Sequence, residues 1–170
     1  MKKITLLKTL TIALFLLMGV GNAWGQSTYT ENFDTDGNWS GGTMTGYNAK
    51  TYTSSSEPSN DKFSSNSAVR ESSDVNRGSY AWRLNSGAYY FRYECEETVS
   101  SFTLWMARWD NSPTPSMNIR YSVNGGLSYT DIEDINGDWF TGDKVYKQYT
   151  YSFPSAISPV SGQKIYIEVI

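Results

Sequence analysis

Residues 117–123 restrict the fold of this chain more than any other part of the sequence. Apolar residues fall at positions 117, 119, 121 and 123, with polar residues between them. That spacing is typical of a strand with one buried face. Asn124 and Gly125 follow directly, and an Asn-Gly pair favours a hairpin turn because it accepts positive φ angles. We therefore predict a β-hairpin here, with the chain resuming as a strand over residues 127–130.

Other segments repeat this alternation, and turn-forming residues separate them. We predict a hairpin across Asn85-Ser86-Gly87 and a long Ser-rich surface loop over residues 54–66. The mature region shows no convincing helical period, so the sequence predicts an all-β fold, an antiparallel β-sandwich. The further strands are predicted at residues 28–33, 47–53, 68–71, 80–84, 88–93, 99–108, 145–153 and 164–170.

Residues 1–25 have the layout of a secretory signal peptide. The start is positively charged, an apolar run covers residues 10–20, and small residues follow. The spacing of Ala23 and Gly25 predicts cleavage before Gln26, with a cut after Ala23 as the alternative. The apolar run has 11 residues, and a bilayer span needs roughly 20. We therefore expect export and no membrane span after cleavage.

Two parts follow from this division: a signal peptide, residues 1–25, and one β-sandwich domain, residues 26–170. The destination is the cell exterior or the cell surface, with the periplasm as the alternative. The alternating apolar strand that reaches Ile170 has no polar tail. Either the sandwich lacks its last strand, or this strand pairs centrally in the sheet. Both alternatives stay open on the sequence.

The charge of the mature chain excludes some functions. Three of the 14 Lys and Arg precede residue 26, so 11 basic residues stand against 17 acidic ones. Nucleic acid binds basic surfaces and is not an expected partner.

The chain has no histidine, which removes the commonest general base. The lone Cys95 lies between Glu94 and Glu96, and neighbouring carboxylates disfavour a thiolate nucleophile. We expect no enzyme.

One short acidic segment is a candidate metal site. Asp34, Asp36 and Asn38 carry oxygen side chains at alternate positions, and Glu31 lies just before them. Calcium binds about six to eight oxygen ligands, and short Asp-x-Asp-x-Asn loops supply several. These four residues predict a possible structural calcium, and the alternative is an ordinary turn with solvated charges. Residues 131–138 are a second acidic stretch, either a calcium site or a solvated loop.

Aromatic residues are the other binding candidates, since a sugar ring stacks its apolar face on Trp or Tyr. In the strand predicted at 99–108, Phe102, Leu104 and Met106 form the core set, which leaves Trp105 on the opposite face with Trp109. The alternative for each aromatic is packing under a loop or across a strand. The candidate ligand-binding residues are Trp105, Trp109, Trp139 and Tyr90.

Several of these segments resemble secreted jelly-roll domains of Bacteroidetes, of the "choice-of-anchor" kind found in substrates of type IX secretion. The resemblance implies a jelly-roll-like sandwich and a non-catalytic accessory module, without a specific ligand. The family usually ends with a strand that carries an Asp-Asp or Asp-Asn pair, followed by a linker. Neither is present after Ile170, so a C-terminally truncated copy is one expectation. The matching segments are residues 23–26, 29–34, 78–84, 99–102, 108–109 and 121–126.

Together these features predict a non-catalytic extracellular binding module, whose partner is a glycan or an extracellular protein of a larger secreted system. The alternative is a structural or adhesive spacer domain without its own ligand. An autonomous glycoside hydrolase or lyase ranks below both. Acidic pairs such as Asp131 and Glu133 lack the buried setting that raises the pKa of a catalytic acid.

Overall fold

The structure is a computed structural model that describes residues 28, 30–54, 61–72, 78–110 and 114–170. The predicted signal peptide lies outside the described residues. The compact unit considered below is Glu31–Ile170. Within the described residues, no helix is long and apolar enough to cross a membrane.

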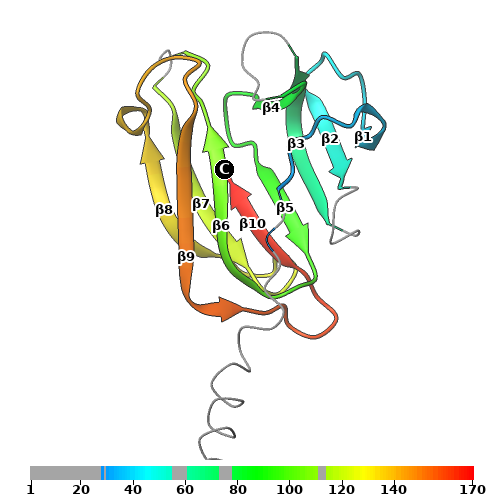
Figure 1. Ribbon diagram of the computed structural model, residues 1–170, viewed down its shortest axis with the longest axis vertical. Coiled ribbons are helices and arrows are strands. Elements are labelled where there is room, and N and C mark those ends of the chain that lie inside the picture. Colours follow the sequence, from blue (N-terminus) through cyan, green and yellow to red (C-terminus); the bar gives the residue numbers. More distant parts are fainter. Residues whose placement is uncertain (1–27, 29, 55–60, 73–77, 111–113) are drawn as a thin grey trace, which may run out of the picture. The chain divides into compact units, whose positions relative to one another are not determined.

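Strands dominate this unit (Figure 1). Two short 3-10 helices, η1 (Asp36–Asn38) and η2 (Gly137–Trp139), lie between them. The strands are β1 (Trp39–Ser40), β2 (Asn48–Thr53), β3 (Lys62–Glu71), β4 (Ala81–Leu84), β5 (Phe91–Cys95), β6 (Val99–Met106), β7 (Ser116–Ser122), β8 (Thr130–Asn136), β9 (Lys147–Ile157) and β10 (Ile165–Val169).

The strands form two antiparallel sheets of unequal size. The large sheet has eight strands in the order β1-β2-β3-β5-β10-β7-β8, with β4 paired to β3 beside this path. β6 and β9 form a separate two-stranded sheet, which lies over one face of the large sheet in Figure 1. The inward side chains of β6 pack on the core of the large sheet. The structure thus confirms the predicted all-β, antiparallel β-sandwich.

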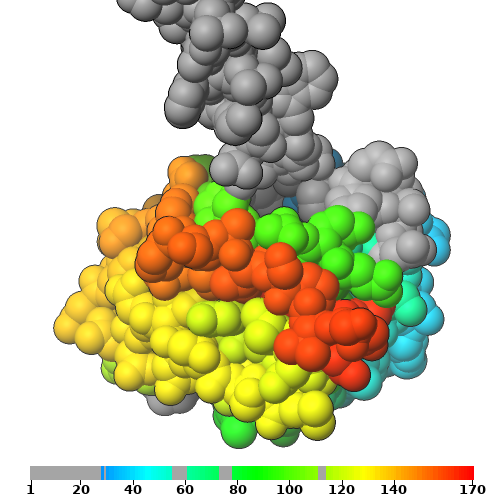
Figure 2. All heavy atoms as spheres, turned by 90° about the horizontal axis from the view of Figure 1, so that it is seen from below, coloured from blue at the N-terminus to red at the C-terminus, as the bar shows by residue number. Residues whose placement is uncertain are grey.

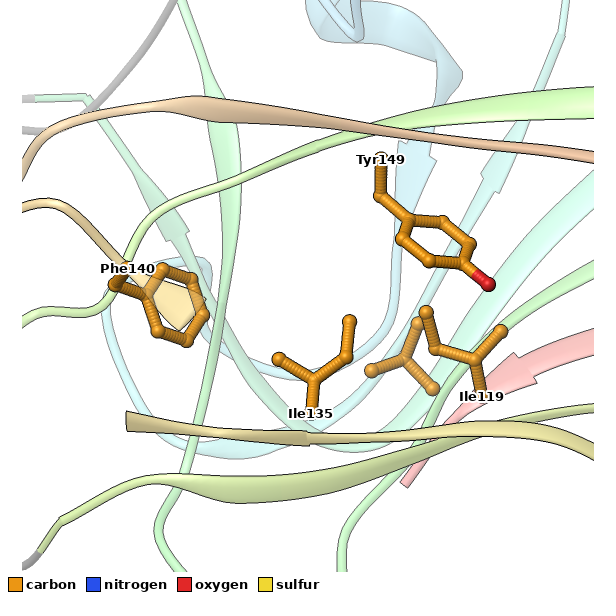
Figure 3. Packing of buried hydrophobic residues seen from close by; sticks show 5 residues of the cluster. Ile119, Ile135, Phe140 and Tyr149 are labelled. Atoms are coloured by element: carbon orange, nitrogen blue, oxygen red, sulfur yellow. The ribbon is translucent and has the colours of Figure 1, made fainter. Parts of the chain in front are cut away.

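The core between the layers follows directly from the alternation in the sequence. Ile119 on β7 and Ile135 on β8 are buried, and Tyr149 on β9 points toward them from the opposite layer (Figure 3). Phe140 closes the same cluster. Burial of each such side chain stabilises the fold by about 1.5–3 kcal/mol. The predicted core set of Phe102, Leu104 and Met106 packs against this cluster as well.

A second cluster is aromatic and surrounds Phe33. The Phe33 ring meets Tyr52 and Phe63 edge to face, with centroids 5.2 and 4.9 Å away. Trp39 and Trp82 complete the cluster. Phe33 has a φ of 63°, a left-handed conformation that a bulky residue rarely adopts. The strand predicted at residues 28–33 was therefore wrong for the described residues: the segment is irregular, and this backbone turns the Phe33 ring into the cluster.

β10 occupies the centre of the large sheet. It pairs with β5 on one side and with β7 on the other. Beyond its end, the backbone of Ile170 exchanges two hydrogen bonds with Asn118, at 2.8 and 3.0 Å. The apolar strand that the sequence left without a neighbour is thus covered on both edges, as the central-pairing alternative predicts.

The hairpin predicted across Asn85-Ser86-Gly87 was wrong. β4 pairs with the second half of β3, while β5 pairs with the first half of β3 and with β10. The long strand β3 makes this possible, and it begins at Lys62, inside the predicted Ser-rich loop. Its residues Phe63, Ser65 and Ser67 are all buried. The polar composition of this segment had suggested a surface loop, but serine is small enough to be buried in a strand. Residues 55–60 of that loop lie outside the described residues.

The hairpin after residues 117–123 is confirmed, since β7 pairs with β8. Gly125 and Gly126 have φ angles of 67° and 86°, so the positive φ angles lie one residue later than the predicted Asn124-Gly125 turn places them. The connection is longer than two residues, however, because β8 begins only at Thr130. The acidic stretch 131–138 is thus mostly strand rather than loop, with Ile135 facing the core.

Candidate functional site

The outer surface of the two-stranded sheet is the clearest candidate for binding. On β6 and β9, residues with inward side chains alternate with residues whose side chains point outward, because successive side chains of a strand face opposite ways. In the continuously paired segments, residues 101–106 and 147–152, the six outward residues are exposed. We call this surface the β6–β9 face; it consists of Ser101, Thr103, Trp105, Gln148, Thr150 and Ser152.

The register of the two strands places these residues in three cross-strand rows. Trp105 is opposite Gln148, Thr103 is opposite Thr150, and Ser101 is opposite Ser152. The hydroxyls of Thr103 and Thr150 are hydrogen-bonded at 3.0 Å. Gln148 Nε2 donates to Thr150 Oγ1 at 3.2 Å. The polar groups are therefore held in fixed positions beside the indole.

The face combines an aromatic ring with neutral hydrogen-bonding groups. The Trp105 side chain is 44% exposed, although it is one of the largest apolar side chains. None of the six residues carries a charge. Such a surface offers a flat apolar platform next to amide and hydroxyl groups. It suits a ligand that has an apolar face and an edge of hydroxyls.

Trp109, the second predicted ligand residue, lies elsewhere. The strand predicted over residues 99–108 ends at Met106, and Arg108 instead forms an isolated bridge with Asp143. Trp109 thus follows the end of β6 and does not belong to the β6–β9 face. The Arg83 guanidinium carbon and the Lys144 ammonium nitrogen lie 3.5 and 4.3 Å from the Trp109 ring centroid. These cation–π contacts connect the segment after β6 to β4 and to the segment before β9.

Trp139 and Tyr90 also have partners within the fold. The Trp139 ring meets Phe140 edge to face, with centroids 5.0 Å apart, and packs on the core cluster. The Tyr90 ring lies against the guanidinium of Arg92, 4.4 Å from its centroid. Trp139 belongs to η2 and Tyr90 precedes β5, so neither belongs to the β6–β9 face. Trp105 is the one predicted ligand residue on that face.

The predicted calcium ligands contact different parts of the fold. The Glu31 carboxylate accepts hydrogen bonds from the hydroxyls of Tyr52 and Ser54, at 3.0 and 2.7 Å. Asp34 accepts from the backbone N–H groups of Ser79 and Tyr80. Glu31 thus fixes the start of the domain to β2, and Asp34 fixes it to the segment before β4.

The other two predicted ligands differ in their surroundings. Asp36 forms an ion pair with Arg70, whereas the buried Nδ2 atom of Asn38 has no hydrogen-bond partner among the described residues. In the described part of the chain, no group of three or more His, Cys, Asp or Glu residues is placed to hold a metal ion. Calcium binding by Glu31, Asp34, Asp36 and Asn38 stays a prediction.

Sequence reasoning missed a charged network on the outer face of the large sheet. Glu168 on β10 is completely buried and accepts hydrogen bonds from Arg92 on β5 and Arg120 on β7. The Tyr129 hydroxyl donates to the same carboxylate at 2.9 Å, and burial together with this contact raises the pKa of Tyr129 to about 12. The only signal in the sequence was a glutamate between apolar residues 167 and 169.

Cys95 is placed as an inert core residue. Its side chain is buried with Ile165 and Ile167. Burial, aided by the negative charge of Asp61, raises the pKa of the thiol from 9.0 to about 12. The thiolate, which is the reactive form, is therefore suppressed at neutral pH.

Comparison with known proteins returned no match: no family model, no curated protein and no solved structure is similar to this chain.

Proposed function

We propose that this chain is a non-catalytic binding module of the cell exterior, and that it binds carbohydrate on the β6–β9 face. The observation that carries the proposal is the exposed indole of Trp105 on the outer surface of the two-stranded sheet, with Gln148, Thr103 and Thr150 beside it. The proposed role is recognition for a larger secreted system.

The chemistry of the face supports a neutral glycan. One side of a pyranose ring presents C–H groups, which pack on an indole, and its rim presents hydroxyls, which need donors and acceptors nearby. Gln148 supplies an amide, and Thr103 and Thr150 supply hydroxyls. The hydrogen bond between the two threonines fixes those hydroxyls in advance. A binding surface that is ordered before the ligand arrives loses less entropy on binding.

The proposed location depends on the N-terminal sequence. A positively charged start, an apolar run and small residues precede Gln26, in the order that directs a chain to export. The resemblance to secreted jelly-roll domains of Bacteroidetes agrees with a cell-surface or secreted module. Glycans are abundant at that location, so an exposed neutral aromatic surface there has ligands available.

A glycan array tests the proposal. The secreted protein is applied beside two variants, Trp105→Ala and Tyr47→Ala. Tyr47 is the matched control because its side chain is 43% exposed, close to the 44% of Trp105, and lies outside the β6–β9 face. We expect neutral glycans to bind the unmodified protein and the Tyr47 variant, and to be lost with the Trp105 variant.

Two results would speak against this function. A blank array for all three proteins supports the alternative of a structural or adhesive spacer without its own ligand. Release of reducing sugar from an arrayed polysaccharide would instead point to an enzyme. Binding that persists in the Trp105 variant would show that the glycan site lies outside the β6–β9 face.

A further inference from the structure

A small cavity lies at one end of the sandwich, away from the outward residues of the β6–β9 face. It has a volume of about 280 Å³ and lies between the β7–β8 hairpin and the end of β9. Figure 2 views this end of the molecule, with the β7–β8 connection in yellow beside the last part of β9 in orange. The backbone of Val160, which follows β9, donates to the carbonyl of Val123 at 2.7 Å, so these segments are tied together.

The cavity lining combines two kinds of chemical group. Hydroxyl residues from three segments contribute to it: Ser122, Ser128, Thr130 and Ser158. Val123, Ile157 and Tyr121 contribute apolar groups. No lining residue carries a charge. The surroundings therefore match a small neutral molecule that carries both hydroxyls and C–H groups.

Two of the hydroxyl residues, Ser122 and Ser128, are held in place by the side chain of Asn124. Its Oδ1 atom accepts from the Ser122 hydroxyl at 2.8 Å and from the Ser128 backbone N–H at 3.0 Å. Its Nδ2 atom donates to Ser128 Oγ at 2.8 Å, which leaves the Ser128 hydroxyl proton to donate elsewhere. The backbone N–H of Gly126 also donates to Ser122 Oγ, at 2.9 Å. The loop is thus ordered before any ligand binds, which lowers the entropy lost on binding.

The apolar lining residues are fixed by packing. The Tyr121 ring meets Phe153 edge to face, with centroids 5.1 Å apart. Val123 and Ile157 pack against the buried cluster of Cys95, Ile165 and Ile167.

We propose that this cavity binds one free neutral monosaccharide. Ligand pockets measure roughly 300–1,000 Å³, so a cavity of about 280 Å³ holds a single ring rather than a chain. Ser128, Thr130 and Ser158 bind the sugar hydroxyls, and the side chains of Val123 and Ile157 contact the C–H face of the ring. The site is independent of Trp105.

Amide NMR spectra of the secreted protein during titration with free monosaccharides test this site. The probes are glucose, galactose, mannose, xylose and N-acetylglucosamine. We expect at least one of them to shift the amide signals of residues 121–123, 128–130 and 157–158. Thr130→Val keeps the side-chain shape and removes one hydroxyl, so it should weaken that binding about fivefold, the effect of one lost hydrogen bond.

The controls separate this site from the proposed function. Thr103→Val makes the same change on the β6–β9 face, and Trp105→Ala removes the aromatic platform; both should leave monosaccharide affinity unchanged. If none of the five sugars shifts these amides, or if Thr130→Val and Ser158→Ala both bind as tightly as the unmodified protein, the cavity is not a sugar site. Loss of array binding on Trp105→Ala would still support the β6–β9 face in that case.

Discussion

Arg120 donates two hydrogen bonds to the same carboxylate oxygen of Glu168, from Nε at 2.9 Å and from Nη2 at 2.8 Å. Arg92 donates to the other oxygen from the opposite side, at 2.6 Å. Glu168 has 0% exposure, although it lies on the face of the large sheet that no second sheet covers. The three side chains lie in one cross-strand row and join β5, β10 and β7.

Removal of the Glu168 charge should destabilise the domain strongly. Glu168→Gln leaves two half-buried guanidinium groups without their anion, and breaking a buried pair in this way costs about 3–5 kcal/mol of unfolding free energy. Urea unfolding measures the loss. The control is Glu96→Gln, because Glu96 is mostly exposed in its pair with Lys164 and exposed pairs contribute at most about 1 kcal/mol. Equal unfolding free energies for the two variants would show that this network does not stabilise the domain.

The aromatic cluster around Phe33 should be a second major source of stability. Phe33→Ala removes a ring that contacts Tyr52, Phe63 and Trp82, and such truncations cost about 3–5 kcal/mol. Leu127→Ala is the control, since Leu127 is 82% exposed and should change the unfolding free energy by less than about 0.5 kcal/mol. A Phe33 variant as stable as the Leu127 variant would show that the first residues of the domain do not contribute to the core.

The domain should lose stability in alkaline solution. Burial raises the pKa of Cys95 from 9.0 to about 12, and of Tyr129 and Tyr149 from 10.0 to about 12. Between these values the folded state holds protons that the unfolded state has released, so the unfolding free energy decreases as the pH rises. Melting temperatures from pH 7 to 11 measure the effect. Tyr149→Phe should make the decrease shallower, and an unchanged slope would contradict this origin.

Calcium should have little effect on stability if the acidic segment near η1 is a structural turn. The Glu31 carboxylate is already bonded to Tyr52 and Ser54, and Asp36 is paired with Arg70. Melting after dialysis against chelator, with and without millimolar calcium, should give the same temperature. A rise on adding calcium that Asp34→Asn abolishes would instead establish the calcium site that the sequence predicts, because a ligand of the folded state stabilises it.

Trp109 should matter for stability rather than for binding. Arg83 and Lys144 lie against its ring, and partly buried cation–π contacts contribute about 0.5–2 kcal/mol each. Trp109→Ala should lower the unfolding free energy and leave array binding unchanged. A stable Trp109 variant that no longer binds the array glycans would place the ligand near Trp109 instead.

The sequence predicted the parts of the fold that local periodicity determines. The alternation at residues 117–123 and the glycines after Asn124 led directly to the hairpin of β7 and β8. Strand partners were harder to predict, because β3 is long enough to pair with both β4 and β5, and this depends on contacts far apart in the chain. A Ser-rich composition hid the first half of β3, in which Phe63 and Ser65 are the buried residues.

The candidate site was partly predictable for the same reason. Alternation alone placed Trp105 opposite the core set on β6, which is where it lies. The residues beside it come from β9, and no local pattern pairs Trp105 with Gln148, 43 residues later in the chain. The row of Arg92, Glu168 and Arg120 could not be predicted from local sequence either, since its residues come from three strands.

Titration calorimetry of the strongest array glycan tests the central claim most directly. The secreted protein is compared with Trp105→Ala, Trp109→Ala and Tyr47→Ala. Loss of a central aromatic residue from a binding site costs about 2 kcal/mol or more, so Trp105→Ala should raise the dissociation constant about 30-fold or more. The other two variants should stay within about twofold of the unmodified protein. A Trp105 variant that binds as tightly as the unmodified protein would contradict carbohydrate recognition by the β6–β9 face.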